Sequence, residues 1–314
     1  MKKILVGLIV LVAALVVLPP VLAPLLGWTP DASVIPPPGR LVEIAGGQRV
    51  NVVETGSGPA IVLVHGLPGS AYDWRPLPER LARGARRIIR YDRIGYGHSD
   101  RRGEGEAFTL EANARELLAL LDALQIDRAT LVGWSYGGGV VQTAALLAPQ
   151  RVRRLVLIAA VGPSYQRSTP GWIQRALRSE RVVRWGLAAG FPGRAQVREE
   201  SSRAFGSIEA MPAWWLDHAL AMMSIPGTIH SWLEEHRRLR ADGLRSAEIQ
   251  VPVLVIQGEN DLLVPASVGE DLQRQIAGSD LLIVSRGSHM LPITHPDLLA
   301  GPILGFAGGG SRSP

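Results

Sequence analysis

The chain has 314 residues, 46% of them hydrophobic and none of them cysteine. This length allows one large domain or one domain with an insertion, and the lack of cysteine excludes disulfides, a thiol nucleophile and cysteine-ligated metals. The formal net charge is only +5, but the pI is about 10.0 because almost every base is arginine. Since the arginines are scattered among acidic residues rather than clustered, the composition argues against a nucleic-acid partner.

The N-terminal segment, residues 1–28, begins with two lysines and carries no further charge. This pattern keeps the N-terminus in the cytoplasm and sends the following residues across the membrane. The unbroken apolar run Ile4–Leu18 has the length of a signal-peptide core and is shorter than the ~20 residues that span a bilayer. Pro24 would follow a cleavage site at Val21-Leu22-Ala23, which favours a retained anchor over a cleaved signal. We therefore expect an exported protein, membrane-anchored on the extracytoplasmic side or, alternatively, secreted.

After a linker at residues 29–40, strands and helices alternate along the chain. Two short strands around a Gly-Gly turn come first. Apolar β-branched runs then predict buried strands at 60–66, 86–92, 129–135 and 152–160. Apolar periodicity predicts helices at Leu110–Leu124, capped by Thr109, and at Tyr136–Leu147. This alternation indicates right-handed crossovers and a mostly parallel sheet.

The alternation stops between residues 163 and 248, which contain amphipathic stretches, five of the eight tryptophans and no convincing strand. It resumes with a strand in VPVLVIQGEND, a helix near Val268–Ile276, a strand in DLLIVSRGSH and a last helix beginning near His295. The predicted division is an α/β core at 41–162 and 249–306, a helical cap at 163–248 and a flexible tail at 307–314.

The pentapeptide Gly133-Trp134-Ser135-Tyr136-Gly137 fits the G-x-S-x-G pattern of a nucleophile elbow. Such short patterns recur by chance, but this one ends a strand and opens a helix, as the elbow requires. A serine hydroxyl is a poor nucleophile until a base takes its proton, and the base needs an orienting acid. The alternative is a glycine-rich turn with an idle serine.

The acid and base are expected after the last two strands of the sheet. Asp261 follows VLVIQGEN and His289 follows LLIVSRGS, and both loops reach the sheet edge that carries Ser135. The order Ser–Asp–His is the one that this topology predicts. Glu259 is a rival acid, and His295 is a rival base, although its context THPD is typical of a helix start.

An oxyanion formed at Ser135 needs hydrogen-bond donors. The backbone N–H of Tyr136 is the first candidate, and that of Leu67, in VHGLPGS, is the second. His65 and Asp92 are interpreted as residues that hold their loops rather than as catalytic groups. The histidines lack metal-ligand spacing such as H-E-x-x-H, so no metal is expected, and the chemistry needs no cofactor.

The motifs HGLPGSAYDW, YDRIGYGHSD, GWSYGGG, GENDLLVP and GSHMLPITHPD, in this order, resemble the α/β-hydrolase superfamily. The similar group includes epoxide hydrolases, haloalkane dehalogenases, cofactor-free haloperoxidases and serine esterases. The resemblance covers about Leu41 to Phe306 and implies the α/β-hydrolase fold, a twisted sheet flanked by helices, with the insertion as its cap. Epoxide hydrolases and haloalkane dehalogenases have aspartate at the nucleophile position. Ser135 therefore excludes those activities and implies acyl transfer.

The expected function is a serine hydrolase of carboxylic esters of apolar small molecules or lipids. Candidates for lining an apolar pocket are Trp134, Trp172, Trp214 and Trp215, although any single tryptophan more often packs in a core. A C–C bond hydrolase and a cofactor-free haloperoxidase or perhydrolase remain alternatives, as does a ligand receptor on the same fold. The expected partners are a small ester or lipid substrate and, through residues 1–28, the membrane.

Overall fold

The computed structural model describes residues 35, 39–103, 105, 107–166, 179, 183, 185 and 194–309. The predicted membrane segment, most of the linker and Trp172 lie outside the described residues. Among those that the structure describes, no helix is long and apolar enough to cross a membrane.

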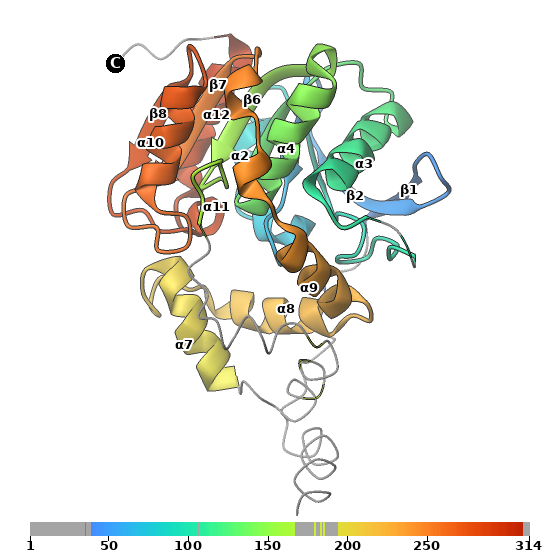
Figure 1. Ribbon diagram of the computed structural model, residues 1–314, viewed down its shortest axis with the longest axis vertical. Coiled ribbons are helices and arrows are strands. Elements are labelled where there is room, and N and C mark those ends of the chain that lie inside the picture. Colours follow the sequence, from blue (N-terminus) through green and yellow to red (C-terminus); the bar gives the residue numbers. More distant parts are fainter. Residues whose placement is uncertain are drawn as a thin grey trace, which may run out of the picture.

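Eight strands form one sheet in the order β1-β2-β4-β3-β5-β6-β7-β8 (Figure 1). Pairing is antiparallel for β1–β2 and β2–β4 and parallel elsewhere, which confirms the mostly parallel sheet. The strands are β1 (Arg40–Glu43), β2 (Arg49–Thr55), β3 (Ala60–Val64), β4 (Arg87–Tyr91), β5 (Ala129–Trp134), β6 (Val152–Ile158), β7 (Val253–Gly258) and β8 (Asp280–Val284).

Helices cover both faces of this sheet, which explains why β5 is buried along its whole length. One apolar cluster joins the sheet to α3 (Leu110–Ala123), α4 (Tyr136–Leu147) and α10 (Ala266–Gln275). A second cluster joins the other face to α2 (Pro78–Ala82), α11 (Leu291–Thr294) and α12 (Pro296–Gly308). The fold therefore has three layers, with the sheet in the middle.

The predicted N-terminal cap of α3 is confirmed. Thr109 caps α3 by accepting a 3.2 Å hydrogen bond from the backbone N–H of Ala112. Helix α12 runs to Gly308, into the segment expected to be a tail.

The short α2 and α11 and the 3-10 helix η2 (Ala71–Trp74) have no counterpart among the predicted elements, because four or five residues show no periodicity. The structure also describes the 3-10 helices η3 (Pro149–Arg151), η4 (Ala241–Gly243) and η5 (Ser246–Glu248).

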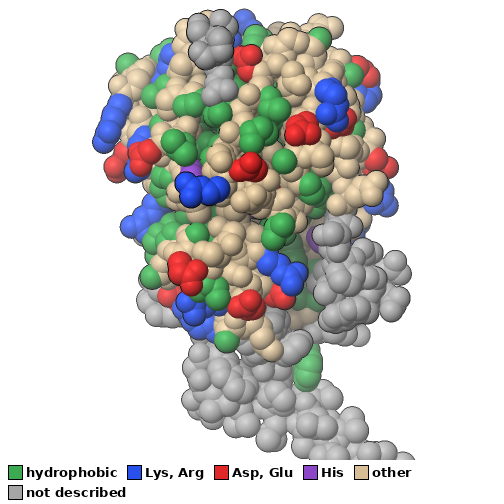
Figure 2. Space-filling model, turned by 90° about the vertical axis from the view of Figure 1, so that its left-hand side faces the viewer, with side chains coloured by type: hydrophobic (Ala, Val, Ile, Leu, Met, Phe, Trp, Pro, Cys, Tyr) green, Lys and Arg blue, Asp and Glu red, His purple; other side chains and the backbone are tan. Residues whose placement is uncertain are grey.

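Between β6 and β7 the chain forms α7 (Arg194–Phe205), α8 (Ala213–Ser224) and α9 (Thr228–Arg238). These helices lie together at one end of the sheet (Figure 1), and the described part of 163–248 contains no strand. We call α7, α8 and α9 the cap helices. The surface drawn in Figure 2 carries basic and acidic side chains interspersed with one another.

Candidate active site

Ser135 lies in the sharp turn between β5 and α4. Its backbone has φ 56° and ψ −120°, a strained conformation for a residue with a side chain. The Ser135 N–H donates to the Ile158 carbonyl at 3.0 Å, and the Ser135 carbonyl accepts from the N–H groups of Gly138 at 2.9 Å and Val161 at 3.2 Å. The neighbouring strand β6 and the first turn of α4 therefore hold this serine in its strained geometry.

Glycines let three segments approach the elbow closely. A Cβ at Gly137 would lie 2.2 Å from the Val64 carbonyl oxygen, and one at Gly133 would lie 2.4 Å from the Gly137 carbonyl oxygen. A Cβ at Gly66 would lie 3.1 Å from the Ser135 Cβ. The G-x-S-x-G spacing thus has a steric cause, and the loop after β3 is packed directly against the serine.

His289 and Asp261 are brought together from the loops that follow β8 and β7. The His289 Nδ1 lies 2.8 Å from the Asp261 Oδ2, and both side chains are buried. The other carboxylate oxygen, Oδ1, accepts from the N–H groups of Leu263 at 2.8 Å and Val264 at 2.9 Å. Because an ionised carboxylate only accepts hydrogen bonds, this arrangement places the proton on Nδ1 and leaves Nε2 as the basic nitrogen.

Ser135 and His289 line the same cavity, which has a volume of about 530 Å³. Its wall is mostly apolar and combines core loops with the cap helices. Asp73 and Glu200 also line it, and burial raises the pKa of Asp73 to about 7. Outside the masked segments, none of its lining residues is arginine or lysine.

Two of the four tryptophans predicted to line the pocket do line this cavity. Trp134 and Trp215 line the cavity. Trp214 is not among the described lining residues and packs edge-to-face on Tyr72, with 5.4 Å between ring centroids. Trp172 is outside the described residues. Trp232 on α9 lines the cavity, although its sequence context gave no reason to prefer it over the other cap tryptophans.

The two expected oxyanion donors come from the residue after the nucleophile and from the loop after β3. Tyr136 is the first residue of α4, where a backbone N–H has no acceptor within the helix. Leu67 and Gly66 line the cavity together with Ser135. The Gly66 carbonyl accepts hydrogen bonds from the His65 Nδ1 at 2.9 Å and from the Arg93 Nη2 at 3.0 Å.

His65 holds the loop on which Leu67 lies. Its Nδ1–H bonds the Gly66 carbonyl, and its Nε2 accepts from the Arg93 N–H at 3.0 Å. Burial, together with the charge of Arg93, lowers the pKa of His65 well below its usual value. The imidazole is therefore neutral, with both nitrogens used. Asp92 similarly accepts hydrogen bonds from its own loop and from neighbouring segments.

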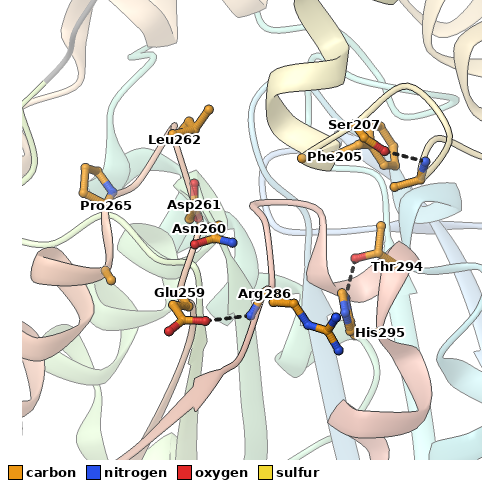
Figure 3. Close-up of a pocket in the computed structure, with 13 residues that line it drawn as sticks. Phe205, Ser207, Glu259, Asn260, Asp261, Leu262, Pro265, Arg286, Thr294 and His295 are labelled. Atoms are coloured by element: carbon orange, nitrogen blue, oxygen red, sulfur yellow. Dashed lines mark hydrogen bonds between the residues drawn. The ribbon is translucent and has the colours of Figure 1, made fainter.

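The rival residues Glu259 and His295 line a separate pocket of about 620 Å³, drawn in Figure 3. The Glu259 carboxylate accepts from the Arg286 N–H at 2.8 Å, which lowers the pKa of Glu259. The His295 Nδ1 bonds the Thr294 hydroxyl at 2.8 Å. Asp261 lines this pocket too, but Ser135 and His289 do not. Only Asp261, and not Glu259, makes the hydrogen bond to the His289 Nδ1. The described residues contain no cluster of three metal-ligating side chains.

Known proteins resemble this chain over most of its length. A family model described as the alpha/beta hydrolase fold matches residues 59–296. A 2-hydroxy-6-oxo-2,4-heptadienoate hydrolase from Pseudomonas putida is 30% identical over 269 residues, covering 81% of this chain and 91% of that protein. A putative non-heme chloroperoxidase from Synechocystis is 30% identical over 268 residues, covering 81% and 92%. Among solved structures, an esterase from Exiguobacterium antarcticum has a TM-score of 0.72 at 21% identity, over 86% of this chain and 100% of that chain.

Proposed function

The chain belongs to the alpha/beta hydrolase fold family, and we propose that it is a serine hydrolase that cleaves carboxylic esters of uncharged, apolar small molecules or lipids. Ser135 attacks the ester carbonyl while His289 takes its proton and then gives it to the leaving alcohol. Asp261 orients the imidazole, and the N–H groups of Leu67 and Tyr136 bind the oxyanion. Water, activated by His289, then hydrolyses the acyl-enzyme.

One observation carries this proposal: a strained serine shares a cavity with a histidine whose Nδ1 is bonded to a buried carboxylate. A serine oxygen that attacks a carbonyl forms an acyl-enzyme, whereas the alkyl-enzyme ester of epoxide and haloalkane chemistry needs a carboxylate nucleophile. Ser135 therefore supports acyl transfer.

The charge of the cavity favours an uncharged substrate. Glu200 lines it, and Asp73 adds a second negative charge above about pH 7, so a carboxylate of the substrate would meet like charge there. The substrate named for the Pseudomonas putida relative is a dienoate, which carries a carboxylate. C–C bond hydrolysis is the second candidate function, since that relative is 30% identical. The acidic residues of the cavity favour ester hydrolysis over it, because they would repel a carboxylate substrate.

The test compares p-nitrophenyl butyrate with the similarly sized but anionic mono-p-nitrophenyl succinate. We expect turnover of the neutral ester, weaker turnover of the anionic one, and loss of both in Ser135→Ala. Ser207→Ala is the matched control, because Ser207 lines the separate pocket of Figure 3. Undiminished turnover by Ser135→Ala would refute the proposed nucleophile. A folded wild type that cleaves no ester but binds ligands would favour the receptor alternative.

A further inference from the structure

A buried ion pair joins the cap helices to the core beside the proposed oxyanion hole. Arg93, two residues after β4, donates through Nη1 to Glu235 Oε1 at 2.7 Å and to Oε2 at 2.9 Å. Glu235 is on α9, and both side chains are completely buried. Since an unpaired buried charge is strongly unfavourable, removing either side chain would leave the other destabilising the fold.

The surroundings of the pair hold both side chains in place. Glu235 also accepts from the Tyr96 hydroxyl at 2.8 Å and from the Asn113 Nδ2 at 2.6 Å. Burial lowers the pKa of an arginine, but the Glu235 carboxylate more than offsets this and raises the pKa of Arg93 above its usual value. Arg93 is thus a permanent cation whose direction is set from the cap.

The Arg93 guanidinium contacts the peptide unit that carries one proposed oxyanion donor. The Arg93 Nη2 donates to the Gly66 carbonyl at 3.0 Å, and this carbonyl and the Leu67 N–H belong to the same planar trans peptide. Holding the oxygen on one side therefore fixes the N–H on the opposite side. A cationic donor on the oxygen also polarises the amide and strengthens its N–H as a donor.

The residue that supplies the second donor touches the same cation. The Arg93 guanidinium carbon lies 4.8 Å from the centre of the Tyr136 ring. The Tyr136 hydroxyl lies 3.4 Å from the Asn113 Nδ2, which also bonds Glu235. Both proposed oxyanion donors are consequently supported by one network that ends on α9.

We infer that Glu235 is a positioning residue for the oxyanion hole, acting through Arg93 on the Gly66–Leu67 peptide. The cap thus sets the geometry of the transition-state site in addition to covering the substrate. The inference rests on the proposed function, because it assigns the oxyanion to Leu67 and Tyr136. It predicts a loss of kcat rather than of substrate affinity, since the oxyanion forms only in the transition state.

The experiment measures kcat and KM for p-nitrophenyl butyrate in Glu235→Gln and in Glu116→Gln. Glu116 is the stringent control, because it forms another buried ion pair, with Arg102 at 2.8 Å, that contacts the same network through Asn113 but makes no bond to Gly66. Removing a whole oxyanion donor lowers kcat by about 10²–10³-fold, so we expect about tenfold for loosening one. KM should change less than about threefold, and Glu116→Gln should stay near wild type. A Glu235→Gln enzyme with wild-type kcat, or equal losses in both variants, would overturn the inference.

A double variant separates positioning from folding. Replacing a buried ion pair by apolar residues is often neutral for stability, so Arg93→Met/Glu235→Met should fold, yet it lacks the cation on Gly66 and should remain slow. Wild-type kcat in this folded variant would contradict the inference.

Amide hydrogen exchange provides a readout without any substrate. Exchange of the Leu67 N–H should rise about fivefold or more in Glu235→Gln and stay unchanged in Glu116→Gln. If the wild type cleaves no ester, the proposed function fails, but this exchange still decides whether α9 fixes the peptide. Equal Leu67 exchange in the wild type and Glu235→Gln would refute the inference on its own.

Discussion

The indole N–H of Trp134 donates a 2.9 Å hydrogen bond to the backbone carbonyl of His289. The residue before the proposed nucleophile therefore supports the loop that carries the proposed base. The centroids of the Trp134 and His289 rings are 5.7 Å apart, and Trp134 is buried. We therefore expect Trp134 to help position His289.

Trp134→Phe should lower kcat about fivefold, because the loss of one hydrogen bond raises the barrier by about 1 kcal/mol. Trp74→Phe is the matched control, since Trp74 is also buried but its indole N–H has no partner among the described residues. Steady-state kinetics with p-nitrophenyl butyrate compares the two. Equal kcat values in both variants would show that the Trp134 bond does not position His289.

Asp73 should make stability depend on pH. Between pH 3.8 and about 7 the folded chain retains a proton on the Asp73 carboxyl that the unfolded chain has released. The folded state binds more protons in this window, so its stability falls as the pH rises and levels off above about 7. Urea unfolding of wild type and Asp73→Asn from pH 4 to 8 measures the difference. A constant difference between the two proteins would be inconsistent with a raised pKa at Asp73.

Two glycine-to-alanine substitutions should have opposite effects on the free energy of unfolding. A Cβ at Gly305, within α12, meets nothing within 4 Å, so Gly305→Ala should stabilise the chain by about 0.5–1 kcal/mol. A Cβ at Gly138, within α4, would lie 2.3 Å from the Ala160 Cβ, so Gly138→Ala should destabilise it. Denaturant unfolding of both variants tests this packing of α4 on the segment after β6, and equal signs of the two changes would contradict it.

Membrane attachment through residues 1–28 remains a proposal. The full-length chain should stay in the membrane fraction after an alkaline carbonate wash and require detergent for release. A chain that begins at Gly39 should be recovered without detergent and keep the wild-type kcat, because the site lies within the described core and cap helices. If the full-length gene product is instead recovered in the soluble fraction and has lost its N-terminal residues, the segment is a cleaved signal.

Much of the core was predictable because its signals are local. Apolar runs mark the strands, and the loops after β5, β7 and β8 place Ser135, Asp261 and His289 in the expected order. The Arg93–Glu235 pair was not predictable, because its residues are 142 positions apart and only the docking of α9 brings them together. Asp73 gave no sign that it would line the cavity, since its place depends on the 3-10 helix η2, which is too short to show a period.

The most direct test of the account is to label the purified protein with a fluorophosphonate and identify the modified residue by mass spectrometry. We predict that the wild type is modified at Ser135, that Ser135→Ala is not modified, and that His289→Ala reacts far more slowly because its serine has lost its base. Absence of labelling in a folded wild type, or modification of another residue, would contradict the claim that Ser135 is an activated nucleophile.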